Sequence, residues 1–482
     1  MGLTLPRIRA QALPGKGPRS HGRIEMADRP EVRRDLRPWW NRLQRPRIEI
    51  DPAGELVGAL RSKSDTEESA TADREVAAKE RYQMTPDSTV PRSSPPNDLG
   101  HLPTLEDLPP VSGRRVLVRA DLNAPLRAKE GGGYEVADDF RLRSSVPTLI
   151  WLRDHGAEVT VCSHLGRPKG KVDPRYSMAP VRDVMSALVP GIAVMENLRF
   201  NPGEEANDPA FVRRLVDGFD YFVNDAFGAC HRSHASIVGP PALLPSAAGR
   251  LLQREVEALS RLLVEPARPF VAVIGGAKVA DKLGVLTSLS EGVDHLLLGG
   301  AMCFTFLAAL GHDVGASHLE PSLVGEAKSL LGAHPSVGLP TDLVALSPEG
   351  VLAIEGSPTG EVRAFGRDLP PDWKGLDIGS ETRSAFAAVI GTAATVLWNG
   401  PMGVSEDPRF AEGTRSIAEA VAACPGFSVV GGGETAAALQ EFGLEDRIDH
   451  VSSGGGATLE LIEKGDLPGL AALRASALIV RG

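Results

Sequence analysis

The sequence predicts an α/β protein with two lobes, each a parallel β-sheet covered by helices, and one helix that joins the lobes. Two observations lead to this prediction. From Leu105 onward, short β-rich runs alternate with helical stretches, which is typical of parallel βαβ units. A long amphipathic stretch at 249–266 interrupts the alternation, and a strand pattern restarts at 269–276. We therefore expect one lobe over 101–250 and a second over 251–465.

The first lobe is expected to contain four buried strands, each ending in polar residues. The strands are expected at 114–120, 158–164, 192–197 and 220–225. Helical patterns lie between them, at 146–156 and 208–218, and 138–141 reads as a further helix start. The carboxyl ends of parallel strands are where such sheets bind ligands.

The second lobe repeats this pattern after the connecting helix. Strands are expected at 269–276, 293–300, 394–400 and 427–433, each running into glycines. The segment from Leu296 to Gly311 is the longest apolar stretch, but its 16 residues fall short of the roughly 20 that a membrane helix needs. We interpret it as a buried strand, a glycine turn and the start of a helix. Both lobes are thus expected to be Rossmann-like α/β/α layers.

Residues 1–100 differ from the rest in composition. The segment is rich in Arg and Pro at first and in Ser, Glu and Pro later, so it buries too little apolar surface to offset chain entropy. We expect a disordered N-terminal extension without the apolar core of a signal peptide. The alternative is that translation starts at Met26 or Met84 and the upstream residues are never made.

Charge and cysteine content exclude several classes of function. The net charge is −10, although residues 1–50 carry twelve Lys and Arg against five Asp and Glu. An acidic body argues against nucleic acid as a partner, because such binding depends on basic patches. The four cysteines form no CxxC pair, so neither a zinc site nor a disulfide framework is predicted and a reducing cytoplasm fits.

Basic and hydrogen-bonding residues follow the strands of the first lobe. Four arginines recur at this predicted edge, with two or three histidines: Arg141, Arg167, Arg199, Arg232, His164, His231 and His234. Asp121 and Asn123 follow the first strand. A single arginine is more simply explained as a surface ion pair, and His234 as structural. Recurrence at several strand ends instead predicts a site for a substrate with both phosphate and carboxylate groups, which arginine binds in bidentate geometry.

Glycine loops follow the strands of the second lobe. They are Gly275-Gly276-Ala277-Lys278, Gly299-Gly300, Asn399-Gly400-Pro401, Gly431-Gly432-Gly433-Glu434-Thr435 and Gly454-Gly455-Gly456. One glycine cluster can simply serve a packing turn, but five at successive strand ends predict a cradle for nucleotide phosphates. Lys278 and Lys282 are four apart, so at a helix start they would project to the same side. No GxxxxGK[ST] motif occurs, so the cradle is not a P-loop.

In this order the motifs resemble the phosphoglycerate kinase family, over roughly Leu105 to Leu473. The segments that carry the resemblance are RADLNAPL, DDFRLR, SHLGRPKGKVDPRYSMAPV, ENLRFNPGEE, VNDAFGACHRSHAS, VIGGAKVADKLGVL, LWNGPMGV, VVGGGET and SSGGGATLELI. The resemblance implies phosphoryl transfer between 1,3-bisphosphoglycerate and ADP, giving 3-phosphoglycerate and ATP, by a monomer. It also implies that 466–482 packs back on the first lobe and that 249–266 acts as a hinge.

The resemblance implies roles for particular residues. Substrate would be bound by Asp121, Leu122, Asn123, Arg141, His164, Leu165, Gly166, Arg167, Arg199 and Arg232. Nucleotide would be bound by Gly276, Ala277, Lys278, Lys282, Gly300, Asn399, Pro401, Glu406, Gly431, Gly432, Gly433, Glu434 and Thr435. Mg²⁺ would be held at Glu434. The transferred group would be neutralised by Arg141, Lys278 and Lys282 with the amides of Gly433 and Gly456.

The chain departs from the family pattern at several points. Glu434 stands where the family has Asp, and an extra methylene shifts a carboxylate that Mg²⁺ requires in tight octahedral geometry. A helix–strand unit is missing after Leu188-Val189-Pro190. Ala301, Ser453 and Ser380 are milder changes. Two alternatives therefore stay open: a catalytically degenerate homologue that binds nucleotide or regulates, and a kinase of the same fold for another small acid.

Overall fold

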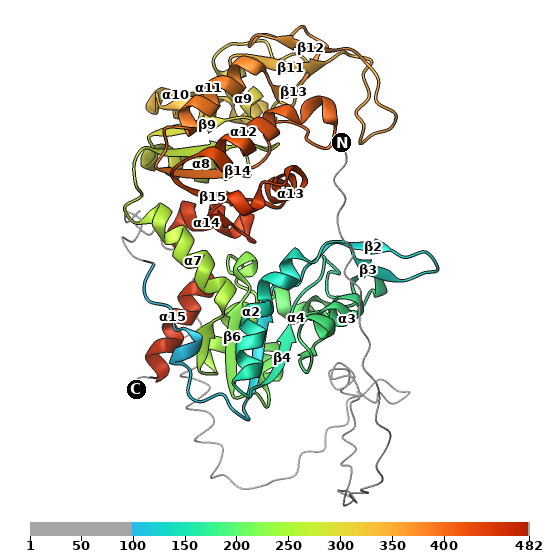
Figure 1. The fold of residues 1–482 in the computed structure, drawn as a ribbon, viewed down its shortest axis with the longest axis vertical. Coiled ribbons are helices and arrows are strands. Elements are labelled where there is room, and N and C mark those ends of the chain that lie inside the picture. The colour runs from blue at the N-terminus through green and yellow to red at the C-terminus, as the bar shows by residue number, and fades with distance from the viewer. Residues whose placement is uncertain (1–98, 481–482) are drawn as a thin grey trace, which may run out of the picture. The chain divides into compact units, whose positions relative to one another are not determined.

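The computed structural model describes residues 99–480, which form the two sets of strands and helices shown in Figure 1. The expectations for the N-terminal extension fall on residues outside this range, apart from Leu99 and Gly100. Within it, the α/β alternation predicted from the sequence is confirmed, and both main sheets are parallel.

The first sheet has the strand order β5-β4-β1-β6-β7, with all neighbours parallel. Its strands are β1 (Arg115–Ala120), β4 (Glu158–Cys162), β5 (Ala193–Val194), β6 (Tyr221–Asp225) and β7 (Ser246–Ala248). Its helices are α2 (Phe140–Asp154), α3 (Ala179–Leu188), α4 (Pro202–Glu205), α5 (Pro209–Val216) and α6 (Ala235–Val238). A hairpin of β2 (Leu126–Ala128) and β3 (Tyr134–Val136) precedes α2. Helix α2 begins six residues earlier than the apolar pattern at 146–156 indicates and contains Pro147.

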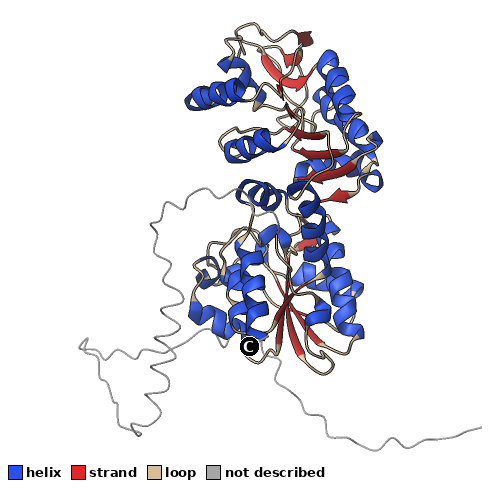
Figure 2. Cartoon of the chain, turned by 90° about the vertical axis from the view of Figure 1, so that its left-hand side faces the viewer, coloured by secondary structure: helices blue, strands red, loops and turns tan. Residues whose placement is uncertain are grey.

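The central strand of this sheet shows why it lies between two layers of helices. Val116, Val118 and Ala120 pack into one apolar cluster, whereas Leu117 points into another on the opposite face. Successive side chains of a strand alternate between faces, so a strand that is apolar on both must be covered on both. Figure 2 shows helices on either side of the strands. Arg119 is the exception within this buried strand, and it is fully buried.

The second sheet has the strand order β10-β9-β8-β14-β15-β16, again parallel. Its strands are β8 (Phe270–Ile274), β9 (His295–Leu298), β10 (Val337–Gly338), β14 (Thr395–Asn399), β15 (Phe427–Gly431) and β16 (His450–Val451). Its helices are α8 (Leu283–Gly292), α9 (Cys303–Ala309), α10 (Val324–Ala333), α11 (Ser380–Ile390), α12 (Glu412–Ala423), α13 (Gly433–Phe442) and α14 (Gly455–Lys464). Strand β8 is completely buried, with alternate side chains in two different clusters.

The apolar segment from Leu296 to Gly311 folds as predicted. It contains most of strand β9, a turn at Gly299-Gly300 and helix α9. Within residues 99–480, no helix is long and apolar enough to cross a membrane.

A small antiparallel sheet was not predicted. Its strands are β11 (Leu343–Leu346), β12 (Val362–Phe365) and β13 (Lys374–Ile378), and their order in the sheet is β12-β11-β13. Strand β12 is largely exposed, so it lacks the buried apolar run by which the other strands were recognised.

The connecting helix, α7, spans Arg250–Leu263, shorter at both ends than the amphipathic stretch in the sequence. Its N-terminus is held by Asp225 at the end of β6, whose carboxylate accepts hydrogen bonds from the N–H groups of Leu251 and Leu252. Farther along, the fully buried Glu255 accepts from Ser453 and contacts His450. Helix α7 is therefore bonded to the end of β6 and to the segment that follows β16.

The last helix, α15 (Pro468–Val480), returns to the first sheet. The N–H of Gly469 donates to the carbonyl of Cys230, and Leu470 and Leu473 are buried. Arg474 donates to the carbonyl of Leu99. The two ends of the described chain are thus bonded to each other, and α15 packs against α6 and β7 of the first lobe.

Candidate functional site

The loops after the strands of the first sheet bring the predicted basic residues to one edge. Since β5, β4, β1 and β6 are neighbours and parallel, the segments that follow them emerge together. These segments contain Arg199, His164 with Arg167, Asp121 with Asn123, and Arg232, respectively. Hydrogen bonds join the loop after β1 to the loop after β4. The side chain of Asn123 accepts from the N–H of Gly166, and the N–H of Leu122 donates to Oγ of Ser163.

Asp121 and Arg141 form an ion pair at this edge. A nitrogen of the Arg141 guanidinium lies 2.7 Å from the Asp121 carboxylate, which is buried, while the Arg141 side chain is 34% exposed. Burial acts to raise the pKa of Asp121, but the charges of Arg141 and Arg119 outweigh it and hold that pKa below its ordinary value. Asp121 is therefore a carboxylate, and Arg141 still presents an open side to solvent.

The other arginines fall into two groups. Arg199 is mostly buried, donates to the carbonyl of Gly166 and pairs with Glu205. Arg167 and Arg232 are exposed, and their side chains make no hydrogen bond or ion pair within residues 99–480. Two unpaired guanidinium groups at one sheet edge are what an anionic ligand requires.

Two predicted substrate residues are placed differently from the rest. The side chains of Leu122 and Leu165 are in the core. Their backbone N–H groups are already used, by Ser163 and by Asn197. In this structure neither residue presents a free donor to a ligand.

The sequence interpretation noted Arg119 at the end of the first strand but gave it no role in the site. Its guanidinium lies 3.1 Å from Nδ1 of His164 and donates to Ser236. The available signal was a charged residue inside an otherwise apolar strand, in the run RVLVRA.

In the second sheet, Lys282 lies beneath the glycine loops. Its Nζ is 2.7 Å from the carbonyl of Gly275 and 2.9 Å from Oδ1 of Asn399. Burial lowers the pKa of Lys282 to about 8, while the nearby charges of Glu434 and Asp281 act to raise it. The ammonium group is thus already held by carbonyl oxygens, next to the loop that carries Glu434.

The prediction that Lys278 and Lys282 share a helix start is wrong. Helix α8 begins at Leu283, so both lysines lie in the loop before it. The reason is that Lys282 turns inward to the carbonyls of Gly275 and Asn399, whereas Lys278 is exposed with no side-chain partner within residues 99–480.

The glycines serve two distinct purposes. A Cβ on Gly300 would lie 2.5 Å from the backbone nitrogen of Gly276, and one on Gly400 would lie 2.5 Å from the carbonyl oxygen of Gly275. These glycines are required because the loops after β8, β9 and β14 touch. A Cβ on Gly433 or Gly456 would instead meet nothing within 4 Å. Both lie in the first turn of a helix, α13 or α14, where free N–H groups attract anions.

The remaining predicted nucleotide residues line the same loops. Thr435 is buried and accepts from the N–H of Gly400, which joins the loop after β15 to the loop after β14. Nδ2 of the buried Asn399 has no hydrogen-bond partner in the described structure. The carbonyl of Pro401 accepts from Gly276, and Ala277 and Glu406 are exposed.

Glu434 meets the requirements for a divalent cation held together with nucleotide phosphates. Its carboxylate is exposed in the first turn of α13 and makes no hydrogen bond or ion pair within residues 99–480. No group of three or more His, Cys, Asp or Glu in that range could hold a metal ion. One carboxylate with room for phosphate oxygens and water is the arrangement that Mg²⁺ commonly adopts, so the residues fit the ion.

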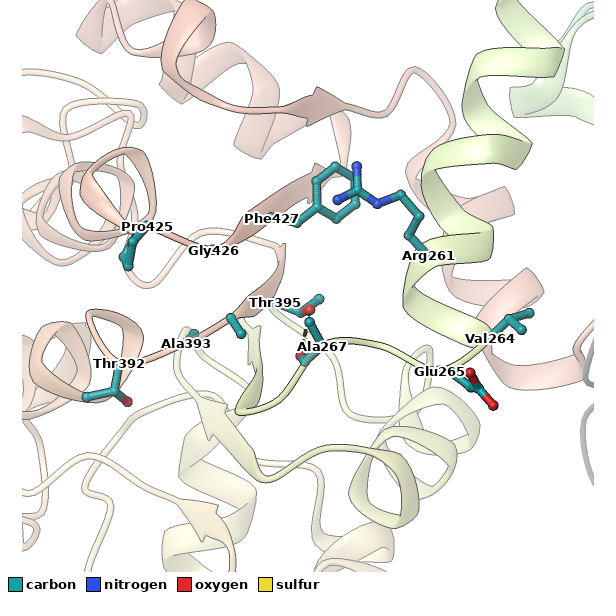
Figure 3. Close-up of a pocket in the computed structure, with 11 residues that line it drawn as sticks. Arg261, Val264, Glu265, Ala267, Thr392, Ala393, Thr395, Pro425, Gly426 and Phe427 are labelled. Carbon is teal, nitrogen blue, oxygen red and sulfur yellow. Dashed lines mark hydrogen bonds between the residues drawn. The ribbon is translucent and has the colours of Figure 1, made fainter.

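A cavity of about 620 Å³ lies away from these loops (Figure 3). It is lined by residues at the starts of β14 and β15, including Thr395 and Phe427, and by Arg261 of α7. The glycine loops lie at the opposite ends of the same strands. We therefore do not assign this cavity to the nucleotide.

The fold and these two sets of residues define an α/β phosphotransferase, with a basic edge on one sheet and phosphate-binding loops on the other. A family model described as phosphoglycerate kinase matches residues 105–192 and 189–465. The phosphoglycerate kinase of Parafrankia sp. (strain EAN1pec) is 48% identical over 405 residues, covering 77% of this chain and 99% of the relative. A phosphoglycerate kinase of Thermus thermophilus is 49% identical over 397 residues, with the same coverage.

Solved structures agree with these sequence comparisons. The phosphoglycerate kinase from Coxiella burnetii has a TM-score of 0.69 at 35% identity, covering 78% of this chain and 99% of that one. The kinase from Pyrococcus horikoshii OT3 has a TM-score of 0.68 at 30% identity and the same coverage. The chain belongs to the phosphoglycerate kinase family.

The comparisons also bear on the expected missing helix–strand unit. The two matched segments overlap at 189–192, directly after the point where the sequence lacks the expected helix and strand. The alignment with the Parafrankia enzyme is 405 positions long, but it includes only 77% of this 482-residue chain, which is fewer residues than 405. The relative therefore has residues that this chain lacks. In the structure α3 runs into the two-residue edge strand β5 through 189–192 alone.

Proposed function

We propose that this chain catalyses the reversible transfer of a phosphoryl group between 1,3-bisphosphoglycerate and ADP, giving 3-phosphoglycerate and ATP, as a glycolytic enzyme. The observation that carries the proposal is that unpaired arginines lie at the edge of one sheet and phosphate-binding loops lie at the edge of the other. One edge offers Arg167 and Arg232, whose side chains have no hydrogen-bond or ion-pair partner within residues 99–480. The other offers open glycine amides at Gly433 and Gly456 together with the ammonium group of Lys282.

On the first sheet, Arg167, Arg199 and Arg232 would hold the phosphate that is not transferred. Asp121 and Asn123 would orient the glycerate hydroxyl and carboxyl groups. Arg141 would face the acyl phosphate. Because Arg141 is paired with Asp121 on one side and open on the other, it can take a phosphoryl oxygen without leaving the carboxylate.

On the second sheet, Lys278, Lys282 and the loop 431–435 would bind the nucleotide phosphates. Glu406 would take the ribose hydroxyls, and Gly276, Ala277, Gly300, Asn399 and Pro401 would wall the pocket. Glu434 would hold Mg²⁺, which when bound neutralises charge on the phosphate oxygens.

The transfer itself needs no covalent enzyme intermediate. Catalysis of this kind consists of positioning and of neutralising charge on the moving group. Arg141, Lys278 and Lys282 with the amides of Gly433 and Gly456 would supply that neutralisation. Closure about α7 would exclude water before transfer; its bonds to Asp225 and, through Glu255, to Ser453 support a hinge at this helix.

Two other functions use the same residues. A degenerate homologue would bind nucleotide without turnover, and a kinase of this fold could act on a different small acid. None of the proposed charge-neutralising residues is replaced, which favours the phosphoglycerate reaction. Glu434 in place of Asp is the one change at the proposed metal position.

A coupled assay with 3-phosphoglycerate and Mg-ATP tests the proposal. Turnover above that of the Arg141→Ala variant supports it. Absence of turnover, with nucleotide binding detected by calorimetry, would instead establish a binding protein. Turnover that appears only with another carboxylic acid would identify a different kinase.

Further parts of the proposal concern organisation. We assign residues 101–250 with 466–482 to the substrate lobe and 251–465 to the nucleotide lobe. We also propose a monomer that acts in the cytoplasm without nucleic acid as partner. All four cysteines are free thiols, which is compatible with a reducing compartment.

A further inference from the structure

A buried chain of polar groups leads from α4 to the substrate edge. Oε1 of Glu204 lies 2.6 Å from Oγ of Ser236, which lies 2.8 Å from Nε of Arg119. A terminal nitrogen of Arg119 lies 3.1 Å from Nδ1 of His164. Glu204, Ser236 and Arg119 are fully buried, and His164 is 7% exposed.

The chemistry of these groups determines the direction of every hydrogen bond in the chain. An arginine side chain only donates, so the hydroxyl oxygen of Ser236 accepts a hydrogen bond from Nε of Arg119. The same hydroxyl group then donates its hydrogen bond to Glu204. The backbone N–H of Ser236 donates to the other oxygen of Glu204. The carboxylate therefore balances the charge of Arg119 through the serine. Such a balance matters because an unpaired buried charge is costly.

At the other end, Arg119 determines where His164 carries its proton. Nδ1 accepts from the guanidinium, so in the neutral ring the proton is on Nε2. Nε2 makes no hydrogen bond within residues 99–480, and it is not one of the fully buried polar atoms there, so it stays accessible although most of the ring is buried. An accessible N–H donor at this edge is available to an anionic ligand.

The surroundings keep the ring neutral. Arg119 of β1, Asp121 after β1, Arg199 after β5 and Arg141 of α2 are the charged groups that act on it. Burial and then Arg119 hold the pKa of His164 well below its ordinary range, and Asp121 opposes them only in part.

We propose that Ser236 and Glu204 are positioning residues: through Arg119 they hold His164 as a neutral Nε2–H donor aimed at the anionic substrate. The inference rests on the proposed substrate site. The histidine would thus contribute a directed hydrogen bond, and the positive charge would come from the arginines.

Nitrogen-15 NMR of the substrate-free full chain tests the tautomer directly. With labelled histidine, the signals of His164 are identified by their loss in the His164→Gln variant. We expect Nε2 protonated and Nδ1 unprotonated from about pH 5.5 to pH 8. An Nδ1–H tautomer, or a ring that titrates near its ordinary pKa of about 6.5, would overturn the proposal.

Kinetics test the link to substrate. Ser236→Ala should raise the KM for 3-phosphoglycerate about 10- to 100-fold, the effect of one lost hydrogen bond to a charged group, with a smaller change in kcat. The His164 signals should shift to a mixture of tautomers. Ser145→Ala is the matched control, because Ser145 is equally buried in α2 of the same lobe and its hydroxyl has no partner in the described structure. Its KM should match that of the unchanged protein.

Glu204→Gln separates this role from a loss of folding. It keeps the size of the side chain and one of the two oxygen acceptors that Ser236 uses, but it removes the balancing charge, so the KM should rise while circular dichroism stays unchanged. Folded Ser236→Ala and Glu204→Gln proteins with unchanged KM would overturn the positioning role. An unchanged KM in His164→Ala, which removes the donor altogether, would instead show that His164 does not bind the substrate, whatever the NMR tautomer.

Discussion

Raising the pH should weaken nucleotide binding because Lys282 loses its charge. Burial lowers the pKa of this lysine from 10.5 to about 8, which corresponds to about 3 kcal/mol against protonation. Below pH 8 the ammonium form is present in the free enzyme. Above pH 8 the side chain is neutral, and binding of anionic phosphates must bring the proton back. The dissociation constant of Mg-ADP should therefore be level below pH 8 and rise by up to about tenfold per pH unit above it.

Calorimetry measures both consequences of this linkage. Titrations of Mg-ADP between about pH 6.5 and pH 9.5, in pairs of buffers with different ionisation enthalpies, report the affinity and the number of protons taken up. At pH 8 binding should take up about half a proton, because the free lysine is then half protonated. No proton uptake at pH 8, together with constant affinity up to pH 9.5, would refute the argument.

Two variants assign the effect to Lys282. Lys282→Arg stays charged at every pH tested, so its affinity should not fall above pH 8. Asn399→Asp places a carboxylate where Oδ1 now lies 2.9 Å from Nζ, which should raise the pKa of the lysine and move the fall in affinity to higher pH. If Lys282→Arg shows the same fall as the unchanged protein, another group is responsible.

Three further predictions concern charge at single positions. Lys278→Ala should lower kcat about 10³-fold or more with an unchanged unfolding temperature, because this lysine is exposed and makes no hydrogen bond or ion pair among the described residues; a near-normal rate would remove it from the transfer step. Glu434→Asp should raise kcat with Mg²⁺ more than with Mn²⁺, and identical kinetics with both ions would mean that the added methylene has no effect. Hydrogen bonds from Arg409 lower the pKa of Asp407 to about 2, so Arg409→Gln should cost about 2 kcal/mol in urea unfolding at pH 7. The part of that difference that comes from the ion pair should persist above about pH 4 and disappear as the pH falls through 2, whereas the part that comes from the bonds of Arg409 to the carbonyls of Thr359 and Val351 should remain. A difference that does not change with pH would contradict the role of the ion pair.

The sequence was sufficient for eight of the eleven parallel strands within residues 99–480 and for the edge at which each ends; no range was predicted for the short strands β7, β10 and β16. Strands such as β1 and β8 are short apolar runs buried on both faces, and this makes them visible without a structure. In the antiparallel sheet, β12 is exposed and carries no apolar run, so it could not be recognised in the same way, whereas the buried apolar run of β11 was overlooked.

For the site, residue types were predictable but their partners were not. Both Gly300 and Gly433 read as phosphate-loop glycines, yet only the neighbours in space show that the first is required for packing and the second is open. Likewise, Arg119 stands two positions before Asp121, but its contact with His164 depends on the pairing of β1 with β4. Such contacts join residues distant in sequence, and no local pattern encodes them.

The return of α15 to the first sheet has a consequence for biosynthesis. Strands β1 to β7 leave the ribosome long before Pro468, and domains generally fold in the order in which they are made. Until α15 arrives, the surface at Cys230 and Ile237 that receives Gly469 lacks its cover. More than two hundred residues separate Ala248, the end of β7, from Pro468, the start of α15. The first sheet therefore stays incompletely covered while these residues are translated.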